Sequence, residues 1–401
     1  MKSNSDSLTP SAYIDSKQAK DRLRNTLAAY ESLHVPDIAD VMDQFKDKLI
    51  FIYGGGCYGQ ATFQTFSKYG VSVKKFLDIK AQPGDTLFGI PVHRADDELL
   101  DARDKERAIV VTALVKDHTT REGIFDFIRG CGFKTIVDAQ SIRCHSVYFD
   151  NKLAADKISV HIKKQSEDIL RCFDLFKDEH SQKVYYANSM AHIMRKYDNC
   201  LESTESVQYF PDDIFFDKGY GRFIDCGGYI GDTVDQLLAI KEEVRAIAVF
   251  EPNMDNFLKL SLNMNNYSSR ISELYLWPCA VSDKTDIRFM DYDGGSSALN
   301  SENKKNCVQC VSLDDVLKNF APTFLKMDVE GEERKTIIGA EDIIKRHRPD
   351  LAICVYHCIN HLWDIALLID SWNLNYEFHL KTHNSCTMET VLYATSRTTG
   401  A

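Results

Sequence analysis

One short segment constrains the fold of this chain more than any other: residues 223–233, which read Phe-Ile-Asp-Cys-Gly-Gly-Tyr-Ile-Gly-Asp-Thr. An apolar run leads into Asp225 and a turn that contains Gly227 and Gly231, and a second apolar run later ends in Glu251. Glycine lets backbone groups approach a ligand closely, and an acidic residue at the end of the second strand can accept hydrogen bonds from a ribose diol. The segment therefore predicts a strand, a turn, a helix and a second strand of an α/β sheet.

The spacing of the turn separates two kinds of ligand. Its pattern is D-x-G-x-x-x-G, whereas the dinucleotide fingerprint is G-x-G-x-x-G. The pattern resembles the turn by which class I methyltransferases hold S-adenosylmethionine, so this resemblance makes S-adenosyl-L-methionine the expected cofactor. The residues that we assign to cofactor binding are Asp225, Gly227, Gly228, Gly231, Thr233, Glu251, Asn253, Ala280 and Asp328.

Composition excludes several other classes of function. The net charge is −11 and there is no long basic run, which disfavours a nucleic-acid partner because phosphate contacts need clustered Lys and Arg. No run of 18 apolar residues and no apolar segment at the N-terminus occur, so neither membrane insertion nor a signal peptide is expected. The 12 cysteines are scattered, which favours a reduced, cytoplasmic protein.

The order of patterns along the chain predicts four parts. Residues 1–45 form an N-terminal helical extension, residues 46–145 a Rossmann-like α/β domain, residues 146–215 a charged helical connector, and residues 216–401 a second α/β domain. Strands of the first domain are expected at 48–54, 73–77, 108–112 and 135–137, with helices at 59–69 and 121–129. Connector helices are expected at 158–176 and 181–197, and strands of the second domain at 222–226, 246–251, 273–278, 323–328, 350–356, 375–380 and 390–395, interrupted by a β-hairpin at 286–312.

The first domain has a glycine turn of its own. Residues 54–59 fit G-x-G-x-x-G after a strand, and Asp78 ends the next strand, which raises the alternative of an NAD-dependent oxidoreductase. The domain is short and supplies no evident hydride-transfer site. Residues 76–78 and 89–92 resemble small Rossmann-like domains of bacterial sugar-modifying enzymes, where the fold has no redox role. The sequence leaves NAD, a nucleotide or nucleotide-sugar, and an empty docking domain as alternatives.

Further segments of the second domain carry a family resemblance. Together with the turn, they resemble the FkbM family of S-adenosylmethionine-dependent methyltransferases over about 200–397, and residues 207–211 resemble the lead-in of the longer bacterial members. The segments are 279–283, 294–297, 311–316, 324–333, 356–357 and 389–394.

The resemblance implies a class I methyltransferase doubly wound sheet and O-methylation of a hydroxyl on a sugar, glycolipid or polysaccharide-type acceptor. The partner is then a small-molecule or glycan acceptor, and a homo-oligomer is compatible with the sequence. A non-catalytic binding or scaffold protein is the third alternative. The intact set Asp225, Gly227, Gly231 and Glu251 argues against it.

The segment 324–331 also points to a site on physical grounds. Alternate residues of a strand share a face, so Lys326, Asp328 and Glu330 point to one side. Three charged side chains cannot sit unpaired in a dry core. They lie where a strand ends, and α/β sheets bind ligands in the crevice beyond the carboxyl ends of their strands.

Methyl transfer to a hydroxyl needs alignment and a base. The acceptor oxygen must lie in line with the sulfonium methyl, and a general base must reach its proton. Asp328, Glu330 and His357 are the catalytic candidates, and His383 is a further one. His357 follows a buried run and histidine titrates in the useful range. We expect Asp328 and His357 to line the acceptor side, one of them receiving the proton.

No metal ligand is assigned. Cys307 and Cys310 would face opposite sides of a strand, and a zinc site needs four ligands. The set Cys354, His357, Cys358 and His361 would straddle a strand and a helix. A magnesium ion at Asp328 and Glu330, by analogy with other sugar methyltransferases, is left open.

Overall fold

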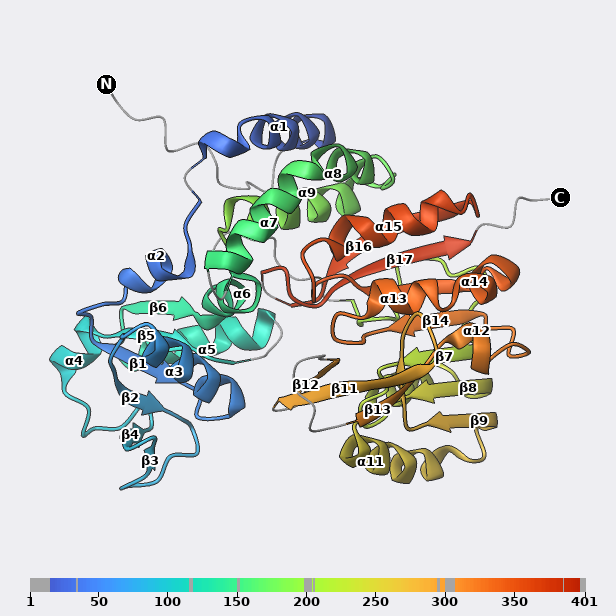
Figure 1. Cartoon of the computed structure of the whole chain (residues 1–401). Helices are drawn as coiled ribbons and strands as arrows, with labels where there is room; N and C mark the ends of the chain where they lie inside the picture. The colour runs from blue at the N-terminus through green and yellow to red at the C-terminus, as the bar shows by residue number, and fades with distance from the viewer. Residues whose placement is uncertain are drawn as a thin grey trace. The chain divides into compact units, whose positions relative to one another are not determined.

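The computed structural model describes residues 15–33, 35–114, 118–149, 152–197, 204, 206–293, 296–299, 307–384 and 386–396. The first 14 residues of the expected N-terminal extension, and residues 294–295 and 300–306 of the expected hairpin, lie outside these ranges. The chain divides into two compact units (Figure 1), and each is considered by itself. The N-terminal unit comprises residues 1–166, 186–204 and 384–388, and the C-terminal unit residues 167–185, 205–383 and 389–401.

The N-terminal unit is built on a sheet in the order β3-β4-β2-β1-β5-β6 within the described residues. All pairs are parallel except β3 with β4, which form a hairpin. The strands are β1 (Ile50–Tyr53), β2 (Val73–Leu77), β3 (Thr86–Leu87), β4 (Ile90–His93), β5 (Ile109–Thr112) and β6 (Thr135–Asp138). The helices are α1 (Ser16–Ala28), α2 (Ile38–Asp43), α3 (Cys57–Lys68), α4 (Ala102–Arg107), α5 (His118–Gly130), α6 (Ala139–Phe149) and α7 (Lys152–Lys164).

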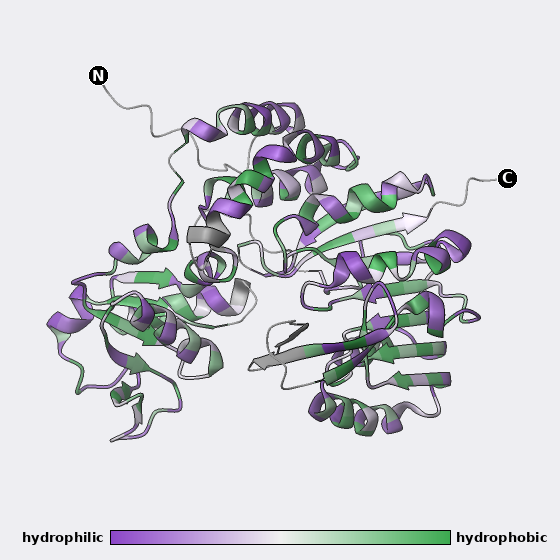
Figure 2. Ribbon diagram, in the orientation of Figure 1, coloured by the Kyte–Doolittle hydropathy of each residue, from purple (hydrophilic) through white to green (hydrophobic). Residues whose placement is uncertain are grey.

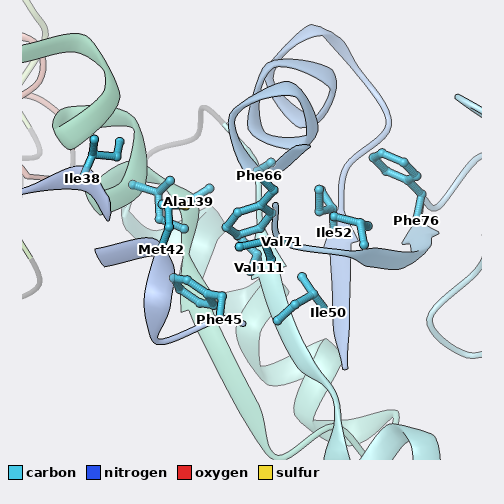
Figure 3. Packing of buried hydrophobic residues seen from close by; sticks show 13 residues of the cluster. Ile38, Met42, Phe45, Ile50, Ile52, Phe66, Val71, Phe76, Val111 and Ala139 are labelled. Carbon is cyan, nitrogen blue, oxygen red and sulfur yellow. The ribbon is translucent and has the colours of Figure 1, made fainter. Parts of the chain in front are cut away.

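Both faces of this sheet are covered. Alternate residues of a strand point to opposite faces, and β1 divides accordingly. Ile50 and Ile52 pack with Met42 and Phe66 in one buried cluster, which Figure 3 shows. Phe51 and Tyr53 pack on the other face in a second cluster that includes residues of α5 and β5. Helices on both faces of a mostly parallel sheet define a Rossmann-like α/β arrangement.

The C-terminal unit contains a sheet in the order β16-β17-β15-β14-β7-β8-β9. All pairs are parallel except those of β17, which runs antiparallel to β15 and β16. The strands are β7 (Arg222–Cys226), β8 (Val244–Phe250), β9 (Ile271–Trp277), β14 (Phe324–Met327), β15 (Asp350–Cys354), β16 (Tyr376–Thr382) and β17 (Thr390–Ser396). The helices include α10 (Asp232–Ile240), α11 (Met254–Met264), α12 (Leu313–Val316), α13 (Glu333–Ile338), α14 (Glu341–His347) and α15 (His361–Ser371).

These strands confirm the expected doubly wound α/β fold. Their bounds agree with the sequence expectation to within about two residues at each end, because the central strands are continuous apolar runs. Figure 2 shows these strands mainly green, whereas α11 carries both purple and green segments. A buried parallel sheet with amphipathic helices is the arrangement that this pattern predicts.

The expected interruption at 286–312 is present as a second small sheet. The strands β10 (Ala280–Val281), β11 (Asp286–Asp293), β12 (Ser296–Leu299) and β13 (Cys307–Val311) are ordered β10-β13-β11-β12. The strand β11 is antiparallel to both β12 and β13. Cys307 is exposed and Cys310 is buried, as the two opposite faces of a strand require.

The helices of the connector differ from the expected ones in their bounds. A single helix over 158–176 is wrong: α7 ends at Lys164 and α8 (Ser166–Phe173) begins after Gln165. The hydroxyl of Ser166 donates to Lys163 O at 2.7 Å, a local bond that competes with continued helix. The next helix, α9 (Glu179–Met194), spans the boundary between the units. Within the described part of the chain, none of the helices combines the length and the hydrophobicity of a membrane span.

Candidate active site

The candidate site lies at one edge of the seven-stranded sheet. The strands β7, β8, β14 and β15 are parallel neighbours, with Cys226 paired to Phe250 and Met327, and Met327 to Ile353. Because carboxyl ends of parallel strands meet at the same edge, the glycine turn, Glu251, Asp328 and the segment leading to His357 emerge together. This edge is where open α/β sheets bind ligands.

The glycine turn is tightly packed against its neighbours. Gly227 has φ +87°, and a Cβ there would lie 1.9 Å from the carbonyl oxygen of Asp328. The N–H groups of Gly227 and Gly228 donate to Phe250 O at 3.0 and 2.9 Å, and that of Gly231 to Gly228 O at 2.8 Å. These amides are therefore used inside the turn. The space beside these glycines is filled by the protein itself, because a Cβ at Gly228 would lie 2.1 Å from Val249 Cγ1 and one at Gly231 2.7 Å from Met264 Cε. Glycine at these positions is therefore required by packing.

Asp225 lies beneath this turn and not on an open surface. Its side chain is fully buried and its Oδ1 lies 2.9 Å from Lys326 Nζ. The register places the two residues opposite each other on β7 and β14, and Lys326 Nζ also donates to Gly227 O at 2.7 Å. Burial raises the pKa of Asp225 to about 6 although Lys326 opposes this, while Asp225 helps to keep the pKa of Lys326 above its usual value against burial. We assign both side chains as charged, because the ammonium group of Lys326 has two acceptors, Asp225 Oδ1 and Gly227 O.

Glu251 is held in place by two backbone donors beside the glycine turn. Its Oε2 accepts from the Tyr229 N–H at 2.9 Å, and its Oε1 accepts from the Asn253 N–H at 2.8 Å. Each carboxylate oxygen keeps a further acceptor position. Burial raises the pKa of Glu251 to about 7, although the two backbone donors favour the charged form. The carboxylate is fixed in orientation with both oxygens able to accept another bond.

The other expected cofactor residues occupy supporting positions. The side chain of Asn253 caps α11, its Oδ1 accepting from the N–H groups of Asp255 and Asn256 at 3.0 and 3.2 Å. Thr233 is buried in α10. Ala280 is buried in β10, which pairs with β13. Gly228, within the turn, faces Val249 of β8, where a Cβ would lie 2.1 Å from Cγ1 of that valine.

Asp328, Glu330 and His357 come together as expected. His357 Nε2 lies 3.5 Å from Asp328 Oδ1 and 3.4 Å from Glu330 Oε2. The second oxygen of Asp328 accepts from the Tyr209 hydroxyl at 2.9 Å. The side chains of Asp328 and Glu330 are 26% and 36% exposed, so solvent reaches the cluster from their side.

Glu333 contacts His357 on the ring nitrogen opposite the one that faces Asp328. The sequence patterns did not assign a role to Glu333. His357 Nδ1 lies 2.7 Å from Glu333 Oε1, and His361 Nδ1 lies 3.1 Å from Glu333 Oε2. Burial alone would lower the pKa of His357, but Glu333, Asp328 and Glu330 outweigh it and raise that pKa to about 10. Burial would raise the pKa of Glu333, but the two imidazoles hold it well below its usual range.

This arrangement alters the expectation for His357. With a pKa of about 10, the imidazole already carries its proton at neutral pH and is a poor proton acceptor. Glu333 closes the segment 324–333, five residues after Asp328. This spacing places Glu333 in the first turn of the helix that follows the strand, α13. The spacing is therefore the sequence signal that could have identified Glu333.

His383 serves a structural purpose. Its Nδ1 contacts Ser206 O at 3.1 Å and its Nε2 contacts the Tyr393 hydroxyl at 2.8 Å. Burial lowers the pKa of His383 to about 4. Both ring nitrogens are engaged.

The segment 207–211 contributes polar contacts that the sequence patterns did not assign. The side-chain amide of Gln208 donates to Glu389 Oε2 at 2.9 Å.

The glycine turn of the N-terminal unit has a related construction. Asp78 Oδ2 accepts from the Gly55 N–H at 2.7 Å, and its Oδ1 accepts from the Lys80 N–H at 2.9 Å. A Cβ at Gly59 would lie 1.8 Å from Gly54 O, whereas a Cβ at Gly56 would meet nothing within 4 Å. Gly59 is thus required by packing and Gly56 is not.

Comparison with known proteins identifies the C-terminal unit. Residues 225–379 match the family model described as the methyltransferase FkbM domain. The chain carries an FkbM methyltransferase domain. The protein is therefore a methyltransferase, as the resemblance in its sequence implied. The matched range contains the glycine turn, Glu251, Asp328 and His357, so the FkbM domain includes the edge described above.

Solved structures extend the likeness in fold. A crystal structure of methyltransferase FkbM from Methylobacillus flagellatus KT is 20% identical, with a TM-score of 0.67 over 94% of this chain and 99% of that one. At this identity the likeness concerns the fold, and it includes the N-terminal unit as well as the FkbM domain. A putative caffeoyl-CoA O-methyltransferase from Staphylococcus aureus matches with 8% identity and a TM-score of 0.28, over 45% of this chain and 78% of that one. No curated protein matches the sequence.

Proposed function

We propose that this FkbM methyltransferase transfers the methyl group of S-adenosyl-L-methionine to a hydroxyl of a sugar, glycolipid or polysaccharide-type acceptor. The observation that carries the proposal is Glu251, whose two oxygens are each oriented by a backbone N–H beside the glycine turn. A ribose diol has two neighbouring hydroxyl donors that fit such a carboxylate. The cofactor then lies over Gly227, Gly228 and Gly231.

Asp225 contributes to cofactor binding indirectly in this proposal. Its buried pairing with Lys326 holds the carbonyl of Gly227 through the 2.7 Å bond from Nζ. The pair fixes the turn on which the methionine end of the cofactor rests. Asn253 likewise acts by orienting Glu251 and by starting α11.

The acceptor hydroxyl approaches Asp328. A sugar hydroxyl is a weak nucleophile, and a positioned base increases the rate of its transfer by roughly 100- to 10,000-fold. Asp328 Oδ2 accepts from Tyr209 and Oδ1 faces His357, so the carboxylate is held in one orientation. We assign Asp328 as the group that takes the proton, with His357 and Glu330 positioning it and the acceptor.

The N-terminal unit serves acceptor choice or assembly in this proposal. A nucleotide or nucleotide-sugar is a candidate ligand for it, and an empty docking domain is the alternative. The cysteines of the described residues form no disulfide and most are buried, which supports a cytoplasmic site of action.

Methyl transfer can be tested before the acceptor is identified. The protein would be incubated with S-adenosylmethionine carrying a tritiated methyl group and with a panel of nucleotide-sugars and oligosaccharides. Label in a methoxy group of a sugar, lost with Asp328→Asn at unchanged cofactor affinity, is the expected result. Label that enters nitrogen or protein side chains instead would contradict the assignment of a hydroxyl acceptor.

A further inference from the structure

The cluster around His357 brings together more ionisable side chains than proton transfer to Asp328 requires. One ligand atom each of Asp328, Glu333 and His357 lies within 4.8 Å of the others. Two of the atoms involved, Asp328 Oδ1 and His357 Nε2, are buried and have no hydrogen-bond partner in the described part of the chain. The side chain of His357 is only 10% exposed. A buried polar atom without a hydrogen-bond partner is costly, and these two atoms lie 3.5 Å apart, so a cation bound between them would give each of them a ligand bond.

We infer that Asp328, Glu330 and His357 form a binding site for a divalent transition-metal ion. The ion would be bound by His357 Nε2, by Asp328 Oδ1 and by a carboxylate oxygen of Glu330. The nitrogen lies 3.5 Å from the first oxygen and 3.4 Å from the second. Two ligands each about 2.1 Å from one ion, at tetrahedral or octahedral angles, are roughly 3.0–3.5 Å apart. The two spacings measured from His357 Nε2 fit that range.

The surroundings orient each ligand toward the ion. Glu333 Oε1 accepts from His357 Nδ1 at 2.7 Å, which leaves Nε2 facing Asp328. A metal ion that binds there displaces the proton of Nε2. A carboxylate behind a metal-bound histidine is the usual way in which such a ring is held. Tyr209 donates to Asp328 Oδ2 at 2.9 Å and so directs Oδ1 to the same place. Glu330 is 36% exposed, which gives the ion a route of entry.

The donor set selects the kind of ion. One imidazole nitrogen with carboxylate oxygens suits Mn²⁺ or Zn²⁺ better than Mg²⁺, which prefers oxygen ligands alone. Charge agrees with a cation, because Asp328, Glu330 and Glu333 bring three carboxylates against the imidazoles of His357 and His361.

What the ion does rests on the proposed function. With positions left for water or an acceptor hydroxyl, it would lower the pKa of that hydroxyl and bring it beside the sulfonium methyl. Asp328 or solvent would then take the proton. Binding of the ion itself does not depend on methyl transfer, so it can be measured without cofactor or acceptor.

The test uses Mn²⁺ alone, with the full chain stripped by chelator. Free Mn²⁺ followed by electron paramagnetic resonance should reveal one ion per chain, and the bound ion should show coupling to a ¹⁴N nucleus. His357→Gln and Asp328→Asn should each weaken binding at least about 10-fold, and His357→Gln should remove the nitrogen coupling. His379→Gln is the matched control, because His379 also faces two carboxylates, Asp178 and Glu377, and should leave binding unchanged.

Circular dichroism would establish that each variant is folded, and Glu330→Gln, at a partly exposed position, provides a milder variant. If wild type binds no more Mn²⁺ or Zn²⁺ than Asp328→Asn at millimolar concentration, a proton occupies the position and the inference is wrong. The same holds if bound Mn²⁺ shows no nitrogen coupling. Cofactor affinity measured in parallel separates this failure from failure of the proposed function.

Discussion

Lys326 Nζ lies 2.9 Å from Asp225 Oδ1, and both side chains are buried to within 2%. The pair joins β14 to β7 directly below the glycine turn, and the same ammonium donates to Gly227 O. One residue of the acceptor-side strand thereby supports the turn on the cofactor side. The two halves of the candidate site are thus joined by a single buried cation.

Removal of this cation should be strongly destabilising. Lys326→Met leaves Asp225 buried without its partner, and breaking a buried pair on one side costs about 3–5 kcal/mol. Urea unfolding should show this loss. Lys335→Met, which breaks the exposed pair with Glu332, should cost less than about 1 kcal/mol. The double variant Asp225→Leu/Lys326→Met should recover much of the stability, and equal costs for Lys326→Met and Lys335→Met would contradict a supporting role.

Gly227 should tolerate no side chain. Its φ of +87° and the 1.9 Å approach of a Cβ to Asp328 O require backbone movement in Gly227→Ala. We expect weaker cofactor binding together with a lower melting temperature. Gly221→Ala is the control, because a Cβ there meets nothing within 4 Å, and it should behave as wild type in both assays. A Gly227→Ala protein with unchanged melting temperature would show that the turn can rearrange.

Glu251 should make stability depend on pH in a defined direction. Its pKa is about 7 in the folded chain against an ordinary value of 4.5. Between these values the folded chain holds a proton that the unfolded chain has lost. The contribution of Glu251 to the unfolding free energy therefore falls as pH rises from about 4.5 to about 7.

Unfolding of wild type and Glu251→Gln at several pH values measures this contribution. The stability difference, variant minus wild type, should increase with pH across that window and be constant above it. A difference independent of pH would mean that Glu251 has an ordinary pKa. Cofactor affinity of wild type should rise over the same window, since the ribose hydroxyls donate to the ionised carboxylate.

The N-terminal glycine turn should not bind a nicotinamide cofactor for catalysis. Gly56→Val fills open space, since a Cβ at Gly56 meets no atom within 4 Å, so the variant should fold normally. Only ligands of the native state raise the melting temperature. We expect a larger rise with S-adenosylmethionine than with NAD or NADP, unaffected by Gly56→Val. A strong rise with NAD that this variant abolishes would favour the oxidoreductase alternative.

The fold was predictable where the sequence repeats a physical pattern. Apolar runs such as 246–250 and 351–356 mark the central strands, because a parallel sheet that is buried on both faces requires them. The hairpin of β3 and β4 was not predicted, because Phe88 and Gly89 at its turn both have positive φ, and phenylalanine is an unusual residue for that conformation. The break between α7 and α8 depends on a local hydrogen bond of Ser166 that propensity does not reveal.

The candidate site was predictable in part for a related reason. Strand ends fix where Asp328, Glu251 and the glycine turn emerge, so their proximity follows from the topology. The contacts of His357 and Asp328 with other elements do not follow from the topology. Glu333 contacts His357 from a different element, and Tyr209 contacts Asp328 from 119 residues away in the sequence. The expected ligand role of Asp225 likewise depended on orientation, and only the register with Lys326 reveals its burial.

The most direct test of cofactor binding at this site is calorimetric titration of S-adenosylmethionine and of its demethylated product into wild type and Glu251→Ala. We expect one bound ligand per wild-type chain and an affinity roughly 10- to 150-fold lower in the variant, the loss of one charge-assisted contact. Glu273→Ala, which removes a partly exposed carboxylate near Arg222, should bind as wild type does. Wild-type affinity in Glu251→Ala, or no binding to wild type, would contradict the proposed cofactor site.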